Sequence, residues 1–382
     1  MAWGFNLYLP LIVKTWSDYS KTSILAVDMY DIILAFLTSF VLTFLAIPSI
    51  ISVAIKKRLM DEPGDRHSHT VSTPSLGGIG IFAGTIFSII LWTPFKYFGD
   101  LQYILCSFII IFLIGAKDDI DPMSPGKKFA GQIFAAFILI FKAKVILTSF
   151  QGILGIYEIP YFLSVGLTLL TILVIINAFN LIDGINGLSG SLGILISVVL
   201  GVWFYQIDHI EIAIVAFSLS GSILAFLKYN VTPAKIFMGD TGSLLLGLVC
   251  SILAIKFIEL HRELPGTPYE EFAFNAAPAV AFGILILPLF DTLRVFTMRI
   301  LKGNSPFYPD RNHIHHLLID SGLSHMQATS ALVMVNMLFI FMVVKLQNIG
   351  SLNLLILVLG VAILLSTMLY FIARNRRKEK QA

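Results

Sequence analysis

The chain of 382 residues is 57% hydrophobic and only 13% charged, with a net charge of +3 and a mean hydropathy of +0.87. Soluble domains contain about 25% charged residues, so the composition excludes an ordinary soluble protein and predicts a polytopic membrane protein. The two cysteines, Cys106 and Cys250, lie in separate apolar stretches. They cannot form a disulfide framework or a Cys-x-x-Cys metal site.

The hydropathy pattern predicts an all-α integral membrane protein. Residues 1–31 lack a signal-peptide pattern, because charged residues interrupt their apolar stretch. We divide the chain into an N-terminal extracytoplasmic segment (1–31), a single membrane-embedded domain (32–373) and a basic cytoplasmic tail (374–382). A window of about 20 apolar residues can cross a bilayer, and only helices satisfy their own backbone there. About eleven such windows occur, at residues 32–55, 76–94, 101–116, 129–148, 161–178, 188–205, 210–228, 241–260, 272–293, 326–345 and 351–373.

The basic residues predict which loops face the cytoplasm. Most of the 26 Lys and Arg residues fall in one set of alternate loops, at 56–73, 117–128, 179–187, 228–240, 294–325 and 374–382. The positive-inside rule makes this set cytoplasmic, with the N-terminus outside and the C-terminus inside. Every polar motif described below lies in the same set. A transporter, the alternative from a different class, should carry polar groups near the bilayer midplane, so the pattern favours an enzyme with a water-soluble substrate.

The first motif is the acidic stretch GAKDDIDPMSPGKK, residues 115–128, which follows an apolar run. It contains the adjacent carboxylates Asp118 and Asp119. Such a pair can bind Mg²⁺ together with substrate phosphates or accept a proton from an attacking oxygen. A solvated helix end is the alternative.

The second motif is NAFNLIDGINGLSG, residues 177–190, where polar side chains recur every three residues. If the preceding helix continues, Asn177, Asn180 and Asp183 share one side of it. Asn186 follows in phase, and the glycines of the loop allow close approach to a ligand. A plain polar turn is the alternative.

The third motif is NVTPAKIFMGDTGS, residues 230–243, which begins with Asn230 and opens the next span at Asp240. At a helix N-terminus, Asp240 can cap the helix or bind a metal, and the sequence favours neither. The free amides of such a terminus also suit a phosphate.

The fourth motif is SPFYPDRNHIHHLLID, residues 305–320, with three histidines within four residues. A zinc site lacks support, because no His-Glu-x-x-His motif and no nearby cysteine occur. Arg311, beside His313, His315 and His316, favours anion recognition. A solvated basic loop is the alternative.

Together with Pro74-Ser75-Leu76-Gly77-Gly78, these motifs resemble the polyprenyl-phosphate N-acetylhexosamine-1-phosphate transferase family, the WecA/MraY/TagO group. They occur in family order, and the resemblance runs from about residue 32 to beyond residue 320. The histidine motif is similar to the WecA/TagO branch, whose members are undecaprenyl-phosphate GlcNAc-1-phosphate transferases. Ile314 interrupts the consecutive histidines that the peptidoglycan branch shows.

The resemblance implies a Mg²⁺-dependent reaction, with Mn²⁺ as a substitute, at the cytoplasmic face of the bacterial inner membrane. A UDP-N-acetyl sugar donates its sugar 1-phosphate to undecaprenyl phosphate and releases UMP, which starts a cell-surface glycan. We expect membrane lipids and both substrates as partners, no nucleic acid, and a homodimer as one option for assembly. The implied residues are Asp118, Asp119 and Asp183 for catalysis; Asp240 and Asp119 for the metal; and Asn180, Asn186, Asn230, Arg311, His313, His315 and His316 for the substrate.

Several alternatives stay open at this point. The donor can carry another N-acetyl sugar or phospho-MurNAc-pentapeptide. Asp118 can act as a base in one step, or an aspartate can form a phospho-enzyme in a two-step route. Asn186 stands where the family often has aspartate, and an amide cannot act as a base.

Overall fold

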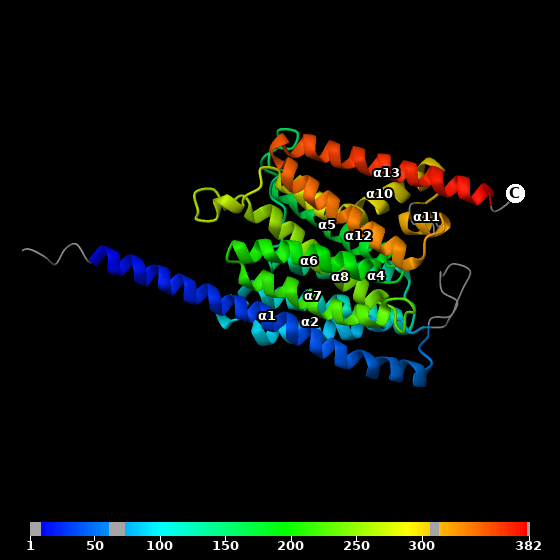
Figure 1. The fold of residues 1–382 in the computed structure, drawn as a ribbon, viewed down its shortest axis with the longest axis horizontal. Helices are drawn as coiled ribbons and strands as arrows, with labels where there is room; N and C mark the ends of the chain where they lie inside the picture. The colour runs from blue at the N-terminus through cyan, green and yellow to red at the C-terminus, as the bar shows by residue number, and fades with distance from the viewer. Residues whose placement is uncertain (1–8, 61–72, 306–312, 380–382) are drawn as a thin grey trace, which may run out of the picture.

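The computed structural model describes residues 9–60, 73–305 and 313–379 (Figure 1). Within these ranges the chain forms helices and short connections, with isolated bridge residues, such as Ile153 and Ile156, but no strand. The prediction of an all-α protein is therefore confirmed. The helices are α1 (Leu9–Lys57), α2 (Gly77–Trp92), η1 (Phe95–Tyr97), α3 (Phe98–Ile120), α4 (Pro125–Phe141), α5 (Tyr161–Ile182), α6 (Leu188–Gln206), α7 (Ile210–Asn230), α8 (Gly239–Leu260), η2 (Glu270–Phe272), α9 (Ala277–Ile284), α10 (Ile286–Leu301), α11 (Ile314–Asp320), α12 (His325–Leu346), η3 (Gln347–Ile349) and α13 (Ser351–Glu379).

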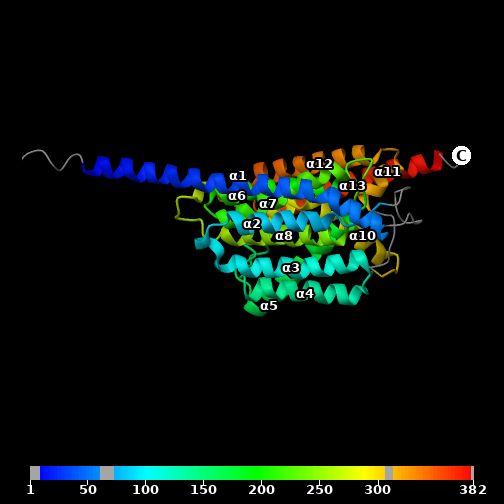
Figure 2. The ribbon, with the colours of Figure 1, turned by 90° about the horizontal axis from the view of Figure 1, so that it is seen from below.

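Most of the long helices run along one common direction (Figures 1 and 2). The chain enters at one end of the bundle with α1 and leaves at the other end with α13 (Figure 1). Helix α8 lies inside and packs against α2, α3, α5 and α6. Nearly all of its side chains are buried, from Thr241 to Leu260.

Apolar side chains also cover the outside of the bundle. Leu45 of α1 and Ile356 of α13 are 64% and 61% exposed. Such a surface is stable only beside lipid. Eight of the described helices are long and apolar enough to cross a membrane, and the protein is a multi-pass membrane protein.

One predicted span, residues 272–293, is broken. Helices α9 and α10 meet at Leu285 with a bend of 81°. Pro288 has no N–H to donate to the carbonyl of Ile284, so the helix cannot continue straight through this point. Asn336 of α12 instead donates a hydrogen bond to that carbonyl at 3.1 Å.

The count of eleven spans stays a prediction. Two further expected spans correspond to α2 and α4, which have only 16 and 17 residues. The predicted segment boundaries at residues 31 and 373 both lie inside helices, α1 and α13.

Two glycines let the backbones of α2 and α3 touch the start of α8. A Cβ on Gly78 would lie 2.1 Å from the backbone nitrogen of Gly242. A Cβ on Gly115 would lie 2.4 Å from the Cα of Thr241. Only glycine allows these approaches, which bring the acidic end of α3 to the first turn of α8.

Candidate active site

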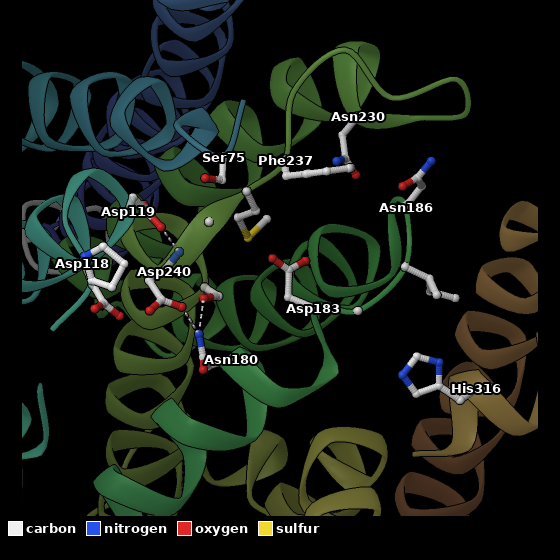
Figure 3. A pocket seen from close by; sticks show the side chains of 16 residues that line it. Ser75, Asp118, Asp119, Asn180, Asp183, Asn186, Asn230, Phe237, Asp240 and His316 are labelled. Carbon is white, nitrogen blue, oxygen red and sulfur yellow. Dashed lines mark hydrogen bonds between the residues drawn. The ribbon is translucent and has the colours of Figure 1, made fainter. Parts of the chain in front are cut away.

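A cavity of about 380 Å³ lies where α3 and α5 end and α8 begins (Figure 3). It collects the acidic, asparagine-rich and Gly-Asp motifs with one histidine of the fourth motif. Its lining includes eight residues singled out from the sequence: Asp118, Asp119, Asn180, Asp183, Asn186, Asn230, Asp240 and His316. Ser75 of the first glycine-containing motif lines it too.

The backbone explains how two of these motifs meet. The N–H of Gly77 donates to Phe237 O and that of Gly78 to Met238 O, both at 2.9 Å. The Phe237 N–H donates in return to Pro74 O at 2.8 Å. These three bonds tie the segment before α2 to the segment before α8.

Asp118 and Asp240 share a half-buried cation, Lys128 of α4. The Lys128 ammonium lies 3.1 Å from Asp118 Oδ2 and is also paired with Asp240 Oδ2. Asp118 Oδ1 accepts a further hydrogen bond from the backbone N–H of Met123 at 2.6 Å. A positive charge thus holds carboxylates from two helices together.

Asp119 makes different contacts from its neighbour Asp118. Its Oδ1 accepts from the N–H of Asp240 at 2.7 Å, and its Oδ2 from the N–H and hydroxyl of Thr241 at 2.9 and 2.5 Å. Both oxygens therefore satisfy free donors of the first turn of α8, as a capping residue would. The structure places Asp119 as the link between α3 and α8.

Asp240 lies in the first turn of α8, and its carboxylate faces Asn180 and Lys128 rather than capping the helix. Its Oδ1 accepts from the Asn180 side-chain amide at 2.5 Å. Asn180 also donates to Ser243 Oγ at 3.0 Å. The Asp240 carboxylate thus lies between the amide of α5 and the cation of α4, facing the cavity (Figure 3).

Asp183 follows the last residue of α5 and accepts a hydrogen bond from Ser189 of α6. Burial raises the pKa of Asp183 to about 6, and the negative charge of Asp240 adds to this rise, while the Ser189 hydroxyl opposes it. A carboxyl with this pKa can change its protonation near neutral pH.

Two asparagines shape the loop between α5 and α6. Asn230 accepts from the N–H of Gly187 at 2.7 Å and donates to the carbonyl of Ile236 at 2.9 Å. Asn186 donates to Thr232 Oγ1 at 2.9 Å. Among the described residues, the buried Oδ1 of Asn186 finds no hydrogen-bond partner, so it can accept from a ligand.

The three histidines do not lie together in the cavity. His313 Nδ1 is 2.8 Å from Asp291 Oδ2, and Asp291 Oδ1 accepts from the N–H of Ile314 at 2.9 Å. His315 is buried against Gly184, and burial, followed by the charge of His316, lowers its pKa to about 3. Only His316 lines the cavity, across from Asp118 (Figure 3). Arg311 lies outside the described residues.

The donor set fits a hard divalent cation. Within the described part of the chain no three His, Cys, Asp or Glu side chains form a complete metal site. Mg²⁺ needs only one or two carboxylates when substrate phosphates and waters supply the rest. Asp118, Asp240 and Asp183 offer carboxylate oxygens in one cavity, with Asn180 adjacent. The membrane bundle and this set of donors suit a membrane-embedded enzyme that acts on phosphates.

Comparisons with known proteins agree. Residues 101–258 match the model of glycosyl transferase family 4. The undecaprenyl-phosphate alpha-N-acetylglucosaminyl 1-phosphate transferase of Pasteurella multocida is 34% identical over 78% of this chain and 81% of its own length. A probable undecaprenyl-phosphate N-acetylglucosaminyl 1-phosphate transferase of Bacillus subtilis is 29% identical, over 84% and 86%. A decaprenyl-phosphate N-acetylglucosaminephosphotransferase of Mycobacterium leprae is 28% identical, over 78% and 79%.

The chain belongs to glycosyl transferase family 4, in its group of polyprenyl-phosphate sugar-1-phosphate transferases. It is an enzyme of the glycosyl-1-phosphate transferase class. The family resemblance read from the motifs is therefore confirmed.

Proposed function

We propose that the protein transfers N-acetylglucosamine 1-phosphate from UDP-N-acetylglucosamine to undecaprenyl phosphate and releases UMP. The supporting observation is the convergence of Asp118, Asp240, Asp183 and Asn180 on one cavity at the end of a membrane bundle. The names of the relatives from Pasteurella multocida and Bacillus subtilis support the sugar and the undecaprenyl lipid.

The reaction exchanges one phosphorus–oxygen bond for another. An oxygen of the lipid phosphate attacks the β-phosphorus of the UDP-sugar. The bond from that phosphorus to the bridging oxygen breaks, and the electron pair leaves with UMP. The product is a polyprenyl diphospho-sugar. Positioning and stabilisation of negative charge dominate such transfers.

Mg²⁺ would neutralise the diphosphate charge, with Mn²⁺ as a substitute. Asp240 would hold it, and Asp183 and Asn180 lie close enough to assist. Asp118 would accept the proton of the attacking lipid phosphate. Lys128 would keep the Asp118 and Asp240 carboxylates together. Asn186 and His316 would contact the nucleotide and the sugar diphosphate.

We place the enzyme in the bacterial cytoplasmic membrane, with the cavity facing the cytoplasm and the N-terminus outside. The cavity lies at the end of the bundle where α13 ends, and the residues around it belong to the basic loop set. A nucleotide sugar made in the cytoplasm would reach it directly. The lipid product would enter cell-surface glycan synthesis.

The deciding experiment follows UMP release by the purified protein with undecaprenyl phosphate, Mg²⁺ and a panel of UDP-sugars. We expect release that requires both lipid and metal, fastest with UDP-N-acetylglucosamine. Preference for another UDP-N-acetyl sugar would correct the donor. No release with any sugar from a folded protein would overturn the proposal.

Labelled UMP distinguishes direct attack by the lipid phosphate from a two-step route through a phospho-enzyme. If attack by the lipid is the only step, UDP-N-acetylglucosamine acquires no label from UMP when the lipid is absent. Exchange without lipid would show a phospho-enzyme.

A further inference from the structure

A second polar cavity, of about 400 Å³, lies at the opposite end of α8 from the active site. Its charged and aromatic lining comes from η1 and the starts of α3 and α7: Lys96, Tyr97, Asp100, His209 and Glu211. Lys256 of α8 completes it. The transfer reaction uses none of these residues.

The position of this cavity along α8 places it near the membrane interface opposite the active site. Asp240 and Lys256 are about 24 Å apart along α8, at 1.5 Å per helical residue. The hydrocarbon core of a bilayer is about 30 Å thick. Trp92 at the end of α2, Tyr97 before α3 and Tyr205 at the end of α6 lie at this same end of the bundle, and such residues mark the headgroup level.

Lys256 supplies a positive charge to this cavity, in addition to that of Lys96. Its side chain is half-buried and makes no hydrogen bond or ion pair within the described parts of the chain. A lysine near a helix end often extends to the interface along the lipid surface. Lys256 instead lines a pocket between α3 and α7, where an ammonium without a hydrogen-bond partner can take an anionic group.

Negative charges lie around the same space. The carboxylates of Asp100 and Glu211 act electrostatically on Lys256. Glu211 is held by His209, whose Nδ1 is 3.1 Å from Glu211 Oε1, and Asp100 is exposed at the mouth of the cavity. A ligand must therefore present both signs of charge.

The rest of the cavity wall is apolar. Leu101, Ile104, Ile212 and Leu260 line it, and Phe95 beside it is 94% exposed. A small soluble zwitterion would leave these groups unused, whereas a lipid would cover them with its glycerol and upper acyl chains.

We propose that this cavity binds the headgroup of an aminophospholipid such as phosphatidylethanolamine. The lipid phosphate pairs with Lys256, and the primary ammonium donates to Asp100 and Glu211. A choline headgroup has no N–H to donate, and an anionic lipid such as phosphatidylglycerol brings no cation for the carboxylates. This site goes beyond the proposed transferase function.

The test is lipid titration of the delipidated, detergent-purified full chain, followed by native mass spectrometry. We expect phosphatidylethanolamine to bind at least tenfold more tightly than phosphatidylcholine or phosphatidylglycerol. Lys256→Met should lower that affinity at least tenfold. Glu211→Gln should remove the preference over phosphatidylglycerol. Lys142→Met, at the same end of the bundle but outside the cavity, is the matched control and should bind as the unaltered protein does.

Three results would overturn the proposal. The first is equal binding of all three lipids by the unaltered protein. The second is unchanged binding by both Lys256→Met and Glu211→Gln; should Lys256→Met fail to fold, Glu211→Gln decides. The third is displacement of the bound lipid by soluble phosphoethanolamine, which would indicate a water-soluble ligand. None of these readouts depends on UMP release.

Discussion

The carboxylates of the active-site cavity lie in different surroundings despite their proximity. Both carboxylate oxygens of Asp119 accept hydrogen bonds from the first turn of α8. Asp118 and Asp240 share Lys128, and Asp183 accepts from Ser189. Each carboxylate should therefore respond to mutation in its own way.

Asp118→Asn and Asp240→Asn should each lower UMP release by roughly 10²-fold or more, the loss typical of removing one stabilising group at a reacting phosphate or carbonyl. Both amides keep the side-chain volume, so the protein should still fold in the membrane. Asp121→Asn is the matched control, because among the described residues Asp121 pairs only with the exposed Lys117, and it lies outside the cavity. A rate near that of the control in either variant would remove that residue from catalysis.

Asp183→Asn should raise the thermal stability of the ligand-free protein at pH 8. The fold raises the pKa of this carboxyl from its usual 3.8 to about 6, so it favours the protonated form. The stability contribution of Asp183 is present in full below pH 4 and is lost as the pH rises through 6. One pKa unit corresponds to about 1.4 kcal/mol. The side chain is partly exposed and screened, so we expect the asparagine to gain on the order of 1–2 kcal/mol at pH 8.

The measurement compares the melting temperatures of both proteins in detergent between pH 4 and pH 8. The difference should be small at the acidic end and grow with pH. A difference that stays constant across this range would contradict the raised pKa.

At this scale the sequence predicted much of the cavity. Periodic spacing placed Asn180 and Asp183 on one side of a helix, and adjacency paired Asp118 with Asp119. It did not reveal Lys128 or Ser189 as partners, because their contacts depend on how separate helices pack. For the same reason, the sequence did not show that His316 alone of the three histidines lines the cavity. Local spacing cannot reveal that Asp291 holds His313 away from it.

At the scale of elements, the start of α8 is held by other helices rather than by its own residues. Asp119 of α3 supplies the hydrogen-bond acceptors, and Gly78 and Gly115 supply the space. Hydropathy windows predicted the extents of most helices within a few residues. They could not predict the bend between α9 and α10, because a window measures apolar content and not direction.

Gly115→Ala should destabilise the protein and lower its activity together. The added Cβ would lie 2.4 Å from the Cα of Thr241, so α3 and α8 must separate, at a cost of about 1–3 kcal/mol for overpacking. Gly166→Ala in α5 is the control, since nothing lies within 4 Å of its added Cβ. An exposed helical glycine gains about 0.5–1 kcal/mol on becoming alanine. The melting temperature measures the stability of each variant, and UMP release measures its activity. Equal melting temperatures and equal rates for Gly115→Ala and Gly166→Ala would contradict the close packing of α3 on α8.

At the scale of the whole molecule, the two ends of the bundle differ in chemistry. One carries the acidic cavity, and the other carries the mixed-charge cavity around Lys256. The distribution of basic residues predicts a direction for this axis from the sequence alone, whereas the path of α9 and α10 and the second cavity depend on how the helices pack.

A cysteine at Asn304 should react with a membrane-impermeant maleimide only from the cytoplasmic side. Asn304 is exposed beyond the end of α10, at the active-site end. A cysteine at Glu263, exposed at the other end, should react only from outside. Cys106→Ser provides the background for both. Labelling of intact cells and inverted vesicles distinguishes the sides, and the reverse pattern would invert the proposed orientation.

The contact of α2 and α3 with α8 through main chain also matters for inhibitor design. Main chain has no rotamers, so this contact, which lies behind the cavity and next to Asp119 and Asp240, cannot shift around a bulky compound as packed flexible side chains can. Compounds that bind in the cavity should therefore gain affinity from rigid, preorganised frameworks. Resistance by a single substitution at Gly78 or Gly115 should be rare, because any side chain placed there also disturbs the fold.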